Sequence, residues 1–310
     1  MRTFLTRSLP VCLLVVTILG GCANNERRVV PVLYEIPDVQ NQFNFKQASL
    51  QRTALTVVTL NVAHGRGNGI HQLFQSADRH QRNLDGISAV LRRERPHVVA
   101  LQEADGPSAW SGGFSHVAYL ARTAGFAYYV RGQHDFFPGL SYGTAILSRL
   151  RLRDSLAVTF RLATPAFRKG FVISSLSWPG RPDMEVDIVS VHLDFINARV
   201  RERQIAQLME VLETRTRPLV LMGDFNSVWN GRKKLLQKLI DEFALSTYEP
   251  ESEGFVSHPL LGRRLDWVFV SRELLIETYE TLPDVVSDHR AVKARILVRP
   301  VSPRQAAFRW

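Results

Sequence analysis

The stretch LVLMGDFN, residues 219–226, is the part of the sequence that says most about the fold and the chemistry of this chain. Its leading apolar residues predict a buried strand, and Gly223 allows a tight turn or a close approach of the backbone to a ligand. Asp224 and Asn226 then project on the same side of the chain. An acid in this position can orient or deprotonate a water molecule, while an amide can donate to an anionic oxygen.

Similar polar residues end other apolar runs of the chain. In order they are Asn61 in TLNV, Gln102 and Glu103 in ALQE, His192 and Asp194 in SVHLD, Asp266 in RLDWVFV, and Asp288 with His289 in SDH. Such side chains provide oxygen ligands for a hard cation, an activator of water and donors to a phosphoryl group. Each motif alone also fits a structural role, such as a solvated strand-end acid or a turn asparagine. Together they predict metal-assisted hydrolysis of a phosphate ester.

Two histidines have predicted carboxylate partners. Asp266 lies in an apolar run where an unpaired carboxylate would be costly, and His289 is the expected partner. A carboxylate at one ring nitrogen fixes the tautomer and leaves the other nitrogen for chemistry. His192 also stands among apolar residues, where a hydrogen-bonded core histidine is the common case. Asp194 is expected on the same strand face and could orient the His192 ring or a metal.

The apolar periodicity predicts alternating helices and strands. Strands are expected over residues 55–62, 97–102, 142–147, 155–160, 171–178, 184–193, 219–222, 265–270 and 291–298. Helices are expected over residues 83–95, 114–123, 198–214 and 233–243. Helices interspersed with many strands indicate an α/β or α+β sandwich.

Residues 1–21 are expected to be a targeting segment. Arg2 and Arg7 give it a basic start, and its apolar run over 9–19 is shorter than the roughly 20 residues of a membrane-spanning helix. The run ends in Leu-Gly-Gly-Cys, which resembles a bacterial lipobox. We therefore expect cleavage before Cys22 and acylation of its thiol; the alternative is an ordinary secretory signal.

A lipobox would place the protein in the cell envelope, lipid-anchored and facing the periplasm. The residue after the cysteine is Ala23 and not the aspartate that often retains lipoproteins at an inner membrane, so the outer membrane is favoured. Cys12 would be removed with the signal, which leaves Cys22 as the one cysteine and excludes an intrachain disulfide or a catalytic thiol in the acylated form.

The mature chain of 310 − 21 = 289 residues suits one large domain over 54–300, after a tether over 22–53 with a short strand at 29–33, and before a tail over 301–310. Loss of Arg2 and Arg7 lowers the net charge from +10 to +8. Arginine dominates the basic residues, which fits an anionic substrate or an anionic membrane surface. A GC-rich genome explains the arginine excess equally well.

In their joint order the motifs resemble the endonuclease/exonuclease/phosphatase superfamily, over about residues 55–298. The resemblance implies a four-layer sandwich of two mixed sheets between helices. It implies Mg²⁺, or Mn²⁺, held chiefly by Glu103 with Asn61 beside it. It also implies that His192 and Asn226 contact the phosphate, that Asp224 acts on the water and that Asp266 orients His289. Asp288 remains for the metal or the water.

Departures from the family pattern add further candidates. Many nuclease members have an acid shortly after the first asparagine, whereas Val62, Ala63 and His64 follow it here. His64 and Arg66 are candidates for phosphate contacts, or only form a loop. Tyr142 is a candidate substrate contact.

The sequence therefore predicts a Mg²⁺-dependent phosphohydrolase, with a phosphodiesterase favoured and water attacking phosphorus directly. The substrate would be nucleic acid or a phospholipid or sphingolipid head group, and no obligate protein partner is inferred. Aromatic residues could line a lipid-facing mouth or belong to the core; they are Trp110, Phe114, Phe136, Phe137 and Trp229. The alternative is a catalytically silent envelope binding module with the same fold.

Overall fold

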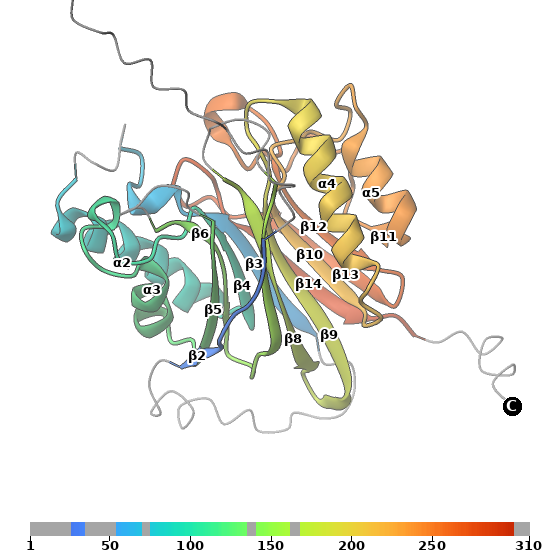
Figure 1. Ribbon diagram of the computed structural model, residues 1–310, viewed down its shortest axis with the longest axis horizontal. Coiled ribbons are helices and arrows are strands. Elements are labelled where there is room, and N and C mark those ends of the chain that lie inside the picture. The colour runs from blue at the N-terminus through green and yellow to red at the C-terminus, as the bar shows by residue number, and fades with distance from the viewer. Residues whose placement is uncertain (1–25, 35–53, 70–74, 135–140, 162–167, 301–310) are drawn as a thin grey trace, which may run out of the picture.

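The computed structural model describes residues 26–34, 54–69, 75–134, 141–161 and 168–300. Two seven-stranded mixed sheets lie face to face, and helices cover their outer faces (Figure 1). This is the four-layer α/β sandwich that the sequence predicts. The expected signal segment, Cys22, Phe136, Phe137 and the tail over 301–310 lie outside the described residues.

The first sheet contains the stretch that ends in Asp224. Its strands, in spatial order, are β1 (Glu26–Val29), β7 (Arg153–Thr159), β8 (Gly170–Trp178), β9 (Arg181–His192), β10 (Leu219–Asp224), β12 (Asp266–Ser271) and β11 (Leu245–Ser246). Only β9 and β10 run parallel.

The second sheet contains Asn61 and the strand that leads to Glu103. Its order is β13 (Leu274–Thr281), β14 (Val292–Val298), β3 (Leu55–Asn61), β4 (Val98–Gln102), β6 (Gly143–Ser148), β5 (Tyr128–Gln133) and β2 (Leu33–Tyr34). Here β3 and β4 are the parallel pair.

Each sheet has its own pair of covering helices. Helices α2 (Ala77–Glu94) and α3 (His116–Ala124) pack on the second sheet, and α4 (Ala198–Leu212) and α5 (Leu235–Phe243) pack on the first. The loops contain the short 3-10 helices η1 (Ala63–Gly65), η3 (Ala109–Ser111) and η4 (Pro259–Leu261). Among the helices of the described ranges, none is both long and apolar enough to cross a bilayer.

Both faces of the central strands, such as β4 and β10, are buried, which explains their continuous apolar runs. Alternate side chains of one strand, such as Val220 and Met222, enter the core between the sheets, while Leu221 packs under α4 and α5. The same alternation places Val57 between the sheets and Val58 under α2 and α3. A polar residue at the end of such a strand is therefore the first one that can leave the apolar interior.

The structure corrects several predicted bounds. Helix α2 begins at Ala77, before the predicted start at residue 83, because the Ser76 hydroxyl accepts from the Arg79 N–H and caps a polar first turn. Strand β5 was not predicted, and neither was β13, whose alternation is interrupted by a bulge between Ile276 and Thr278. Within the predicted tether, residues 26–34 form two edge strands, β1 and β2, one on each sheet.

Candidate functional site

Asp224 lies at the centre of the site, because the strand register places another candidate residue beside it on each neighbouring strand. On one side it pairs with His192 across the parallel strands, and on the other with Asp266. Gly223 makes the pairing possible: its φ is +150°, and a Cβ there would lie 2.0 Å from the Val191 carbonyl oxygen. Gly223 is thus required because strands β9 and β10 approach each other closely at this position.

Three side chains converge on one carboxylate oxygen, Oδ2 of Asp224. The Asn61 amide donates to it at 3.1 Å, Nε2 of His192 lies at 3.4 Å, and Nε2 of His289 lies at 3.8 Å. All four side chains are buried, and they come from both sheets. Burial raises the pKa of Asp224 above its ordinary value, although His289 opposes this.

The predicted contact between Asp266 and His289 is present. Nδ1 of His289 lies 2.7 Å from Oδ2 of Asp266, and the other ring nitrogen faces Asp224. Burial alone would lower the pKa of His289, but the carboxylates of Asp266 and Asp224 raise it to about 10. His289 is therefore an imidazolium at neutral pH, and its ring is fixed by Asp266.

The residue that contacts Nδ1 of His192 is Lys169, whereas the sequence suggested Asp194 as the partner of this ring. Its ammonium nitrogen lies 3.3 Å from Nδ1 of His192. An ammonium only donates, so Nδ1 accepts and the ring proton is on Nε2, directed at Asp224. Burial and the charge of Lys169 hold the pKa of His192 well below its ordinary value, which keeps the ring neutral.

Asp194 has another role, because β9 ends two residues before it. Its Oδ1 accepts from the backbone N–H groups of Ile196 and Asn197, and its own N–H donates to Gln204 of α4. The suggestion that Asp194 orients the His192 ring is therefore wrong: the residue builds the turn into α4.

Glu103 lies in a cluster of cations. Its Oε2 is 3.3 Å from Nε2 of His64, and its Oε1 is 3.5 Å from Nζ of Lys169. Burial alone would raise the pKa of Glu103, but the charges of His64 and Lys169 hold it well below its usual range. Glu103 is thus a carboxylate at every physiological pH.

His64 belongs to a second imidazole–carboxylate pair. Its Nδ1 lies 2.9 Å from Oδ1 of the buried Asp105, so its Nε2 faces Glu103. Burial lowers the pKa of His64, yet Glu103 and Asp105 raise it overall. The rings of Trp110 and Tyr142 stand edge-on to His64 at centroid distances of 5.8 and 5.7 Å. The structure therefore brings Tyr142 and His64 together beside Glu103.

Unusual backbone conformations support this part of the site. His64, Glu103 and Asn226 all have positive φ, at 55°, 51° and 47°. The left-handed region is costly for residues with a side chain and is often found at functional sites. The His80 ring and the Asn83 amide both contact the Gly65 carbonyl, which holds the η1 turn that carries His64.

The remaining candidates are present, but each is already bonded to another group of the protein. Arg66 forms an ion pair with Asp288, whose other oxygen accepts from Ser287. The Asn226 amide donates to the Leu193 carbonyl at 3.0 Å. A substrate contact by Arg66 or Asn226 would therefore use donors that remain beside these bonds.

Sequence reasoning missed Lys169 and Asp105. Lys169 precedes β8, and it is one of only six lysines against 33 arginines, so its type was a usable signal. Asp105 stands two residues after Glu103, but the left-handed turn at Glu103 removes it from the strand pattern.

Two groups of donors could hold a cation. Asp224, Asp266 and His289 place ligand atoms within 4.8 Å of one another, but they are fully buried and already hydrogen-bonded. Mg²⁺ dehydrates reluctantly and usually keeps several waters. Glu103 suits it better, because this ionised side chain is 19% exposed and its partners stand at loose distances. The other two predicted ligands are engaged within the protein: the Asn61 side-chain oxygen accepts from the Ala63 N–H, and Asp288 pairs with Arg66.

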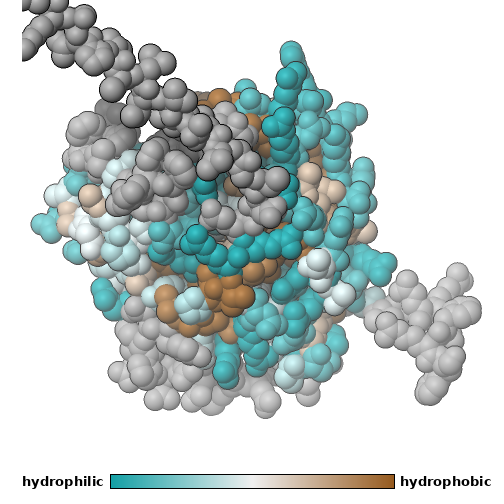
Figure 2. All heavy atoms as spheres, viewed as in Figure 1, coloured by the Kyte–Doolittle hydropathy of each residue, from teal (hydrophilic) through white to brown (hydrophobic). Residues whose placement is uncertain are grey.

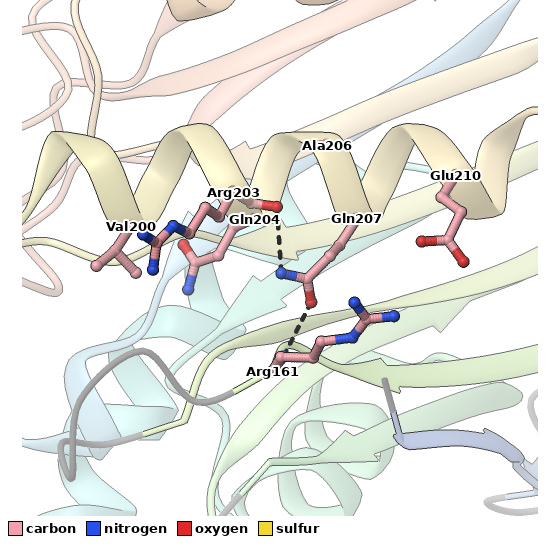
Figure 3. Close-up of a pocket in the computed structure, with 7 residues that line it drawn as sticks. All are labelled: Arg161, Val200, Arg203, Gln204, Ala206, Gln207 and Glu210. Carbon is pink, nitrogen blue, oxygen red and sulfur yellow. Dashed lines mark hydrogen bonds between the residues drawn. The ribbon is translucent and has the colours of Figure 1, made fainter. Parts of the chain in front are cut away.

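The three aromatic candidates that the structure describes do not lie in one place. Trp110 and Phe114 lie near η3, and Trp229 packs against Trp267 at the outer face of the first sheet. A separate hollow of about 420 Å³ runs along α4, with Arg161, Arg203 and Gln207 among its lining (Figure 3). None of the candidate residues lines it, so it is distinct from the site.

Comparison with known proteins agrees with this architecture. The model of the Endonuclease/Exonuclease/phosphatase family matches residues 58–289. No curated protein matches the chain.

Solved structures share the fold at low identity. An endonuclease/exonuclease/phosphatase from Beutenbergia cavernae DSM 12333 is 20% identical, with TM-score 0.64, and the match covers 80% of this chain and 72% of that one. A mannosyl-6-phosphatase of Bacteroides thetaiotaomicron VPI-5482 is 16% identical, with TM-score 0.60 and coverages of 78% and 99%. The human Nocturnin catalytic domain, solved with a bound sulfate anion, is 17% identical, with TM-score 0.59 and coverages of 80% and 98%.

Proposed function

The chain belongs to the endonuclease/exonuclease/phosphatase family and is a phosphoric ester hydrolase, and we propose that it cleaves phosphodiesters by direct attack of water, with Mg²⁺ as cofactor. The observation that carries the mechanism is the convergence of His192 and His289 on one buried carboxylate, Asp224. Glu103, with Asn61 and Asp288, would hold the cation. Bound there, it would supply positive charge to phosphate oxygens.

The side chains divide the work by their protonation states. Asp224, with its raised pKa, is suited to orient the attacking water and accept its proton. His289, cationic and fixed by Asp266, can donate to a phosphoryl oxygen as negative charge develops. Neutral His192 can donate through Nε2, and Asn226 through its second amide hydrogen. Nothing in this division needs a covalent intermediate on the protein.

A phosphomonoester is the second candidate substrate. Arg66, Lys169 and His64 lie around Glu103, and nitrogen donors of this kind suit the additional negative charge of a monoester. One structural neighbour is a mannosyl-6-phosphatase. Both substrate classes need the same water activation at Asp224, so the proposed mechanism applies to either.

An assay of the purified protein separates these candidates. Bis-(p-nitrophenyl) phosphate and p-nitrophenyl phosphate would be compared with Mg²⁺, with Mn²⁺ and with EDTA. We expect turnover of the diester to exceed that of the monoester and to stop in EDTA. Turnover of the monoester alone would replace the first candidate by the second, and activity that is indifferent to EDTA would overturn the role of the metal.

A further inference from the structure

Exposed apolar side chains gather around the site. Of the eight large hydrophobic residues exposed within the described ranges, four lie in two turns next to the site; they are Phe195 at 60%, Ile196 at 70%, Leu260 at 87% and Leu261 at 55%. Single exposed apolar residues are normal, whereas several around one opening indicate an interaction surface.

Contacts connect the first pair to the site. Phe195 and Ile196 follow His192 in the turn into α4. The Phe195 ring centre lies 5.9 Å from Nζ of Lys169, the amine that contacts both Glu103 and His192. This turn therefore borders the Glu103 side of the site.

The second pair borders the opposite side. Leu260 and Leu261 form the exposed end of η4, and the Leu261 N–H bonds to the His258 ring. The His258 ring stands 4.7 Å from the ring of His289. Since His192 and His289 approach Asp224 from two sides, the two apolar turns lie on either side of the site. Both are at the top of the sandwich in Figure 1, and apolar atoms reach the surface at this end in Figure 2.

Arginine accompanies each apolar pair. Exposed Arg199 follows Phe195 and Ile196, and exposed Arg263 follows Leu260 and Leu261 after one glycine. Apolar tips with adjacent arginines suit an anionic bilayer, because the tips enter the acyl boundary while the guanidinium groups remain among phosphates.

The acidic residues near the two apolar turns do not abolish the match to an anionic bilayer. Glu251 and Glu253 precede η4 in the same loop and are exposed, so the apolar tips must provide most of the binding.

We propose that the end of the sandwich formed by the turn at Phe195 and Ile196 and the η4 turn with Leu260 and Leu261 docks onto an anionic phospholipid bilayer. The opening between these turns then faces the lipid head groups. This docking goes beyond the proposed hydrolysis and does not depend on it, because the surface uses side chains outside the candidate catalytic set. It is also separate from any acyl anchor at Cys22.

Local fluorescence tests the docking independently of the N-terminal segment. The full chain with Cys12→Ser and Cys22→Ser would carry one new thiol, by Ile196→Cys or Leu260→Cys, labelled with an environment-sensitive fluorophore. The matched control is Leu275→Cys: Leu275 is also exposed, but it begins β13 at the opposite end of the sandwich. Vesicles of phosphatidylcholine with one quarter phosphatidylglycerol are the probe.

We expect a blue shift of the labels at positions 196 and 260 with these vesicles, quenching by brominated acyl chains, and no change at 275. Adding Leu261→Ser to the Ile196→Cys protein should raise the lipid concentration at half-saturation by about tenfold. Silent labels at 196 and 260, or an equal response at 275, would overturn the proposal. So would a blue shift without vesicles that grows with protein concentration, which would assign the surface to a second copy.

Discussion

Nζ of Lys169 lies 3.3 Å from Nδ1 of His192 and 3.5 Å from Oε1 of Glu103, so one amine joins the two halves of the site. The contact fixes the His192 tautomer from one side and compensates the Glu103 charge from the other. Glu103 follows a strand of the second sheet and His192 ends a strand of the first. Lys169 is therefore a positioning residue at the junction of the sheets.

Lys169→Met should lower kcat/KM by roughly 10- to 100-fold, the usual cost of losing a group that orients a reactive side chain or metal ligand. The pKa of His192 should rise, because the substitution removes one of the two main causes that lower it. The measurement is a pH profile of kcat/KM together with NMR titration of the His192 ring. Lys293→Met is the control, since Lys293 of β14 pairs with Glu94 of α2 and Glu280 of β13, away from the site. Equal effects of both substitutions would mean a merely structural role.

Asp266→Asn should lower the pKa of His289 from about 10 towards its ordinary 6.5, because the largest favourable charge is removed. A raised pKa in the folded state means that protonated His289 contributes stability fully below about pH 6.5 and loses it as the pH rises through about 10. Wild-type unfolding free energy should therefore decline over this window, and the variant should show a flatter profile. Chemical unfolding at several pH values measures it.

The control for that substitution is Asp187→Asn. Asp187 is a fully buried acid bonded to Arg215, so its loss destabilises the protein without reaching His289. An unchanged His289 titration in Asp266→Asn would show that the hydrogen bond does not set the charge of the ring.

Asp224→Asn should reduce turnover by several orders of magnitude, since general-base help is worth about 10²–10⁴ and positioning adds to it. Asn226→Ala should cost about 10²–10³ by the loss of a donor to the phosphoryl group. Substrate affinity should change much less in both. Single-turnover hydrolysis in ¹⁸O-labelled water should place one label on the phosphoryl product. Label that enters only in a second turnover would mean that a protein oxygen attacks first.

Glu103→Gln preserves shape and removes the charge that is proposed to hold the cation. We expect a large loss of turnover and a weaker response to Mg²⁺ with the fold intact, and a somewhat lower thermal unfolding midpoint because Lys169 and His64 lose the anion that compensates them. Mg²⁺ affinity, measured by calorimetry, should fall with it. A folded Glu103→Gln protein with wild-type Mg²⁺ affinity would remove the metal assignment.

Cys22→Ser tests the predicted anchor, which lies outside the described residues. Replacement of the thiol should abolish acylation and either release the protein from membranes or leave an unprocessed precursor. Cell fractionation with metabolic fatty-acid labelling measures both. Wild-type protein found wholly in the soluble fraction would contradict the anchor.

The sandwich fold and most of the candidate site residues could be predicted from the sequence. Its apolar runs predict strands buried on both faces, and a polar residue that ends such a run must lie at the edge of the core, as Asp224 and His192 do. The cost of a buried carboxylate was enough to pair Asp266 with His289 across 23 positions of sequence. These are local or pairwise constraints, so they can be read along the chain.

The side chains that contact one another between the sheets can be identified from the tertiary structure alone. Lys169 and Asp105 lie in irregular segments without periodicity, and their partners Glu103, His192 and His64 arrive from both sheets. Asp194 showed the opposite error, because the strand ended before it and its carboxylate was used by backbone N–H groups. Side-chain direction at a strand end depends on the next turn, and contact between sheets depends on how the whole sandwich packs. Neither is encoded in a local pattern.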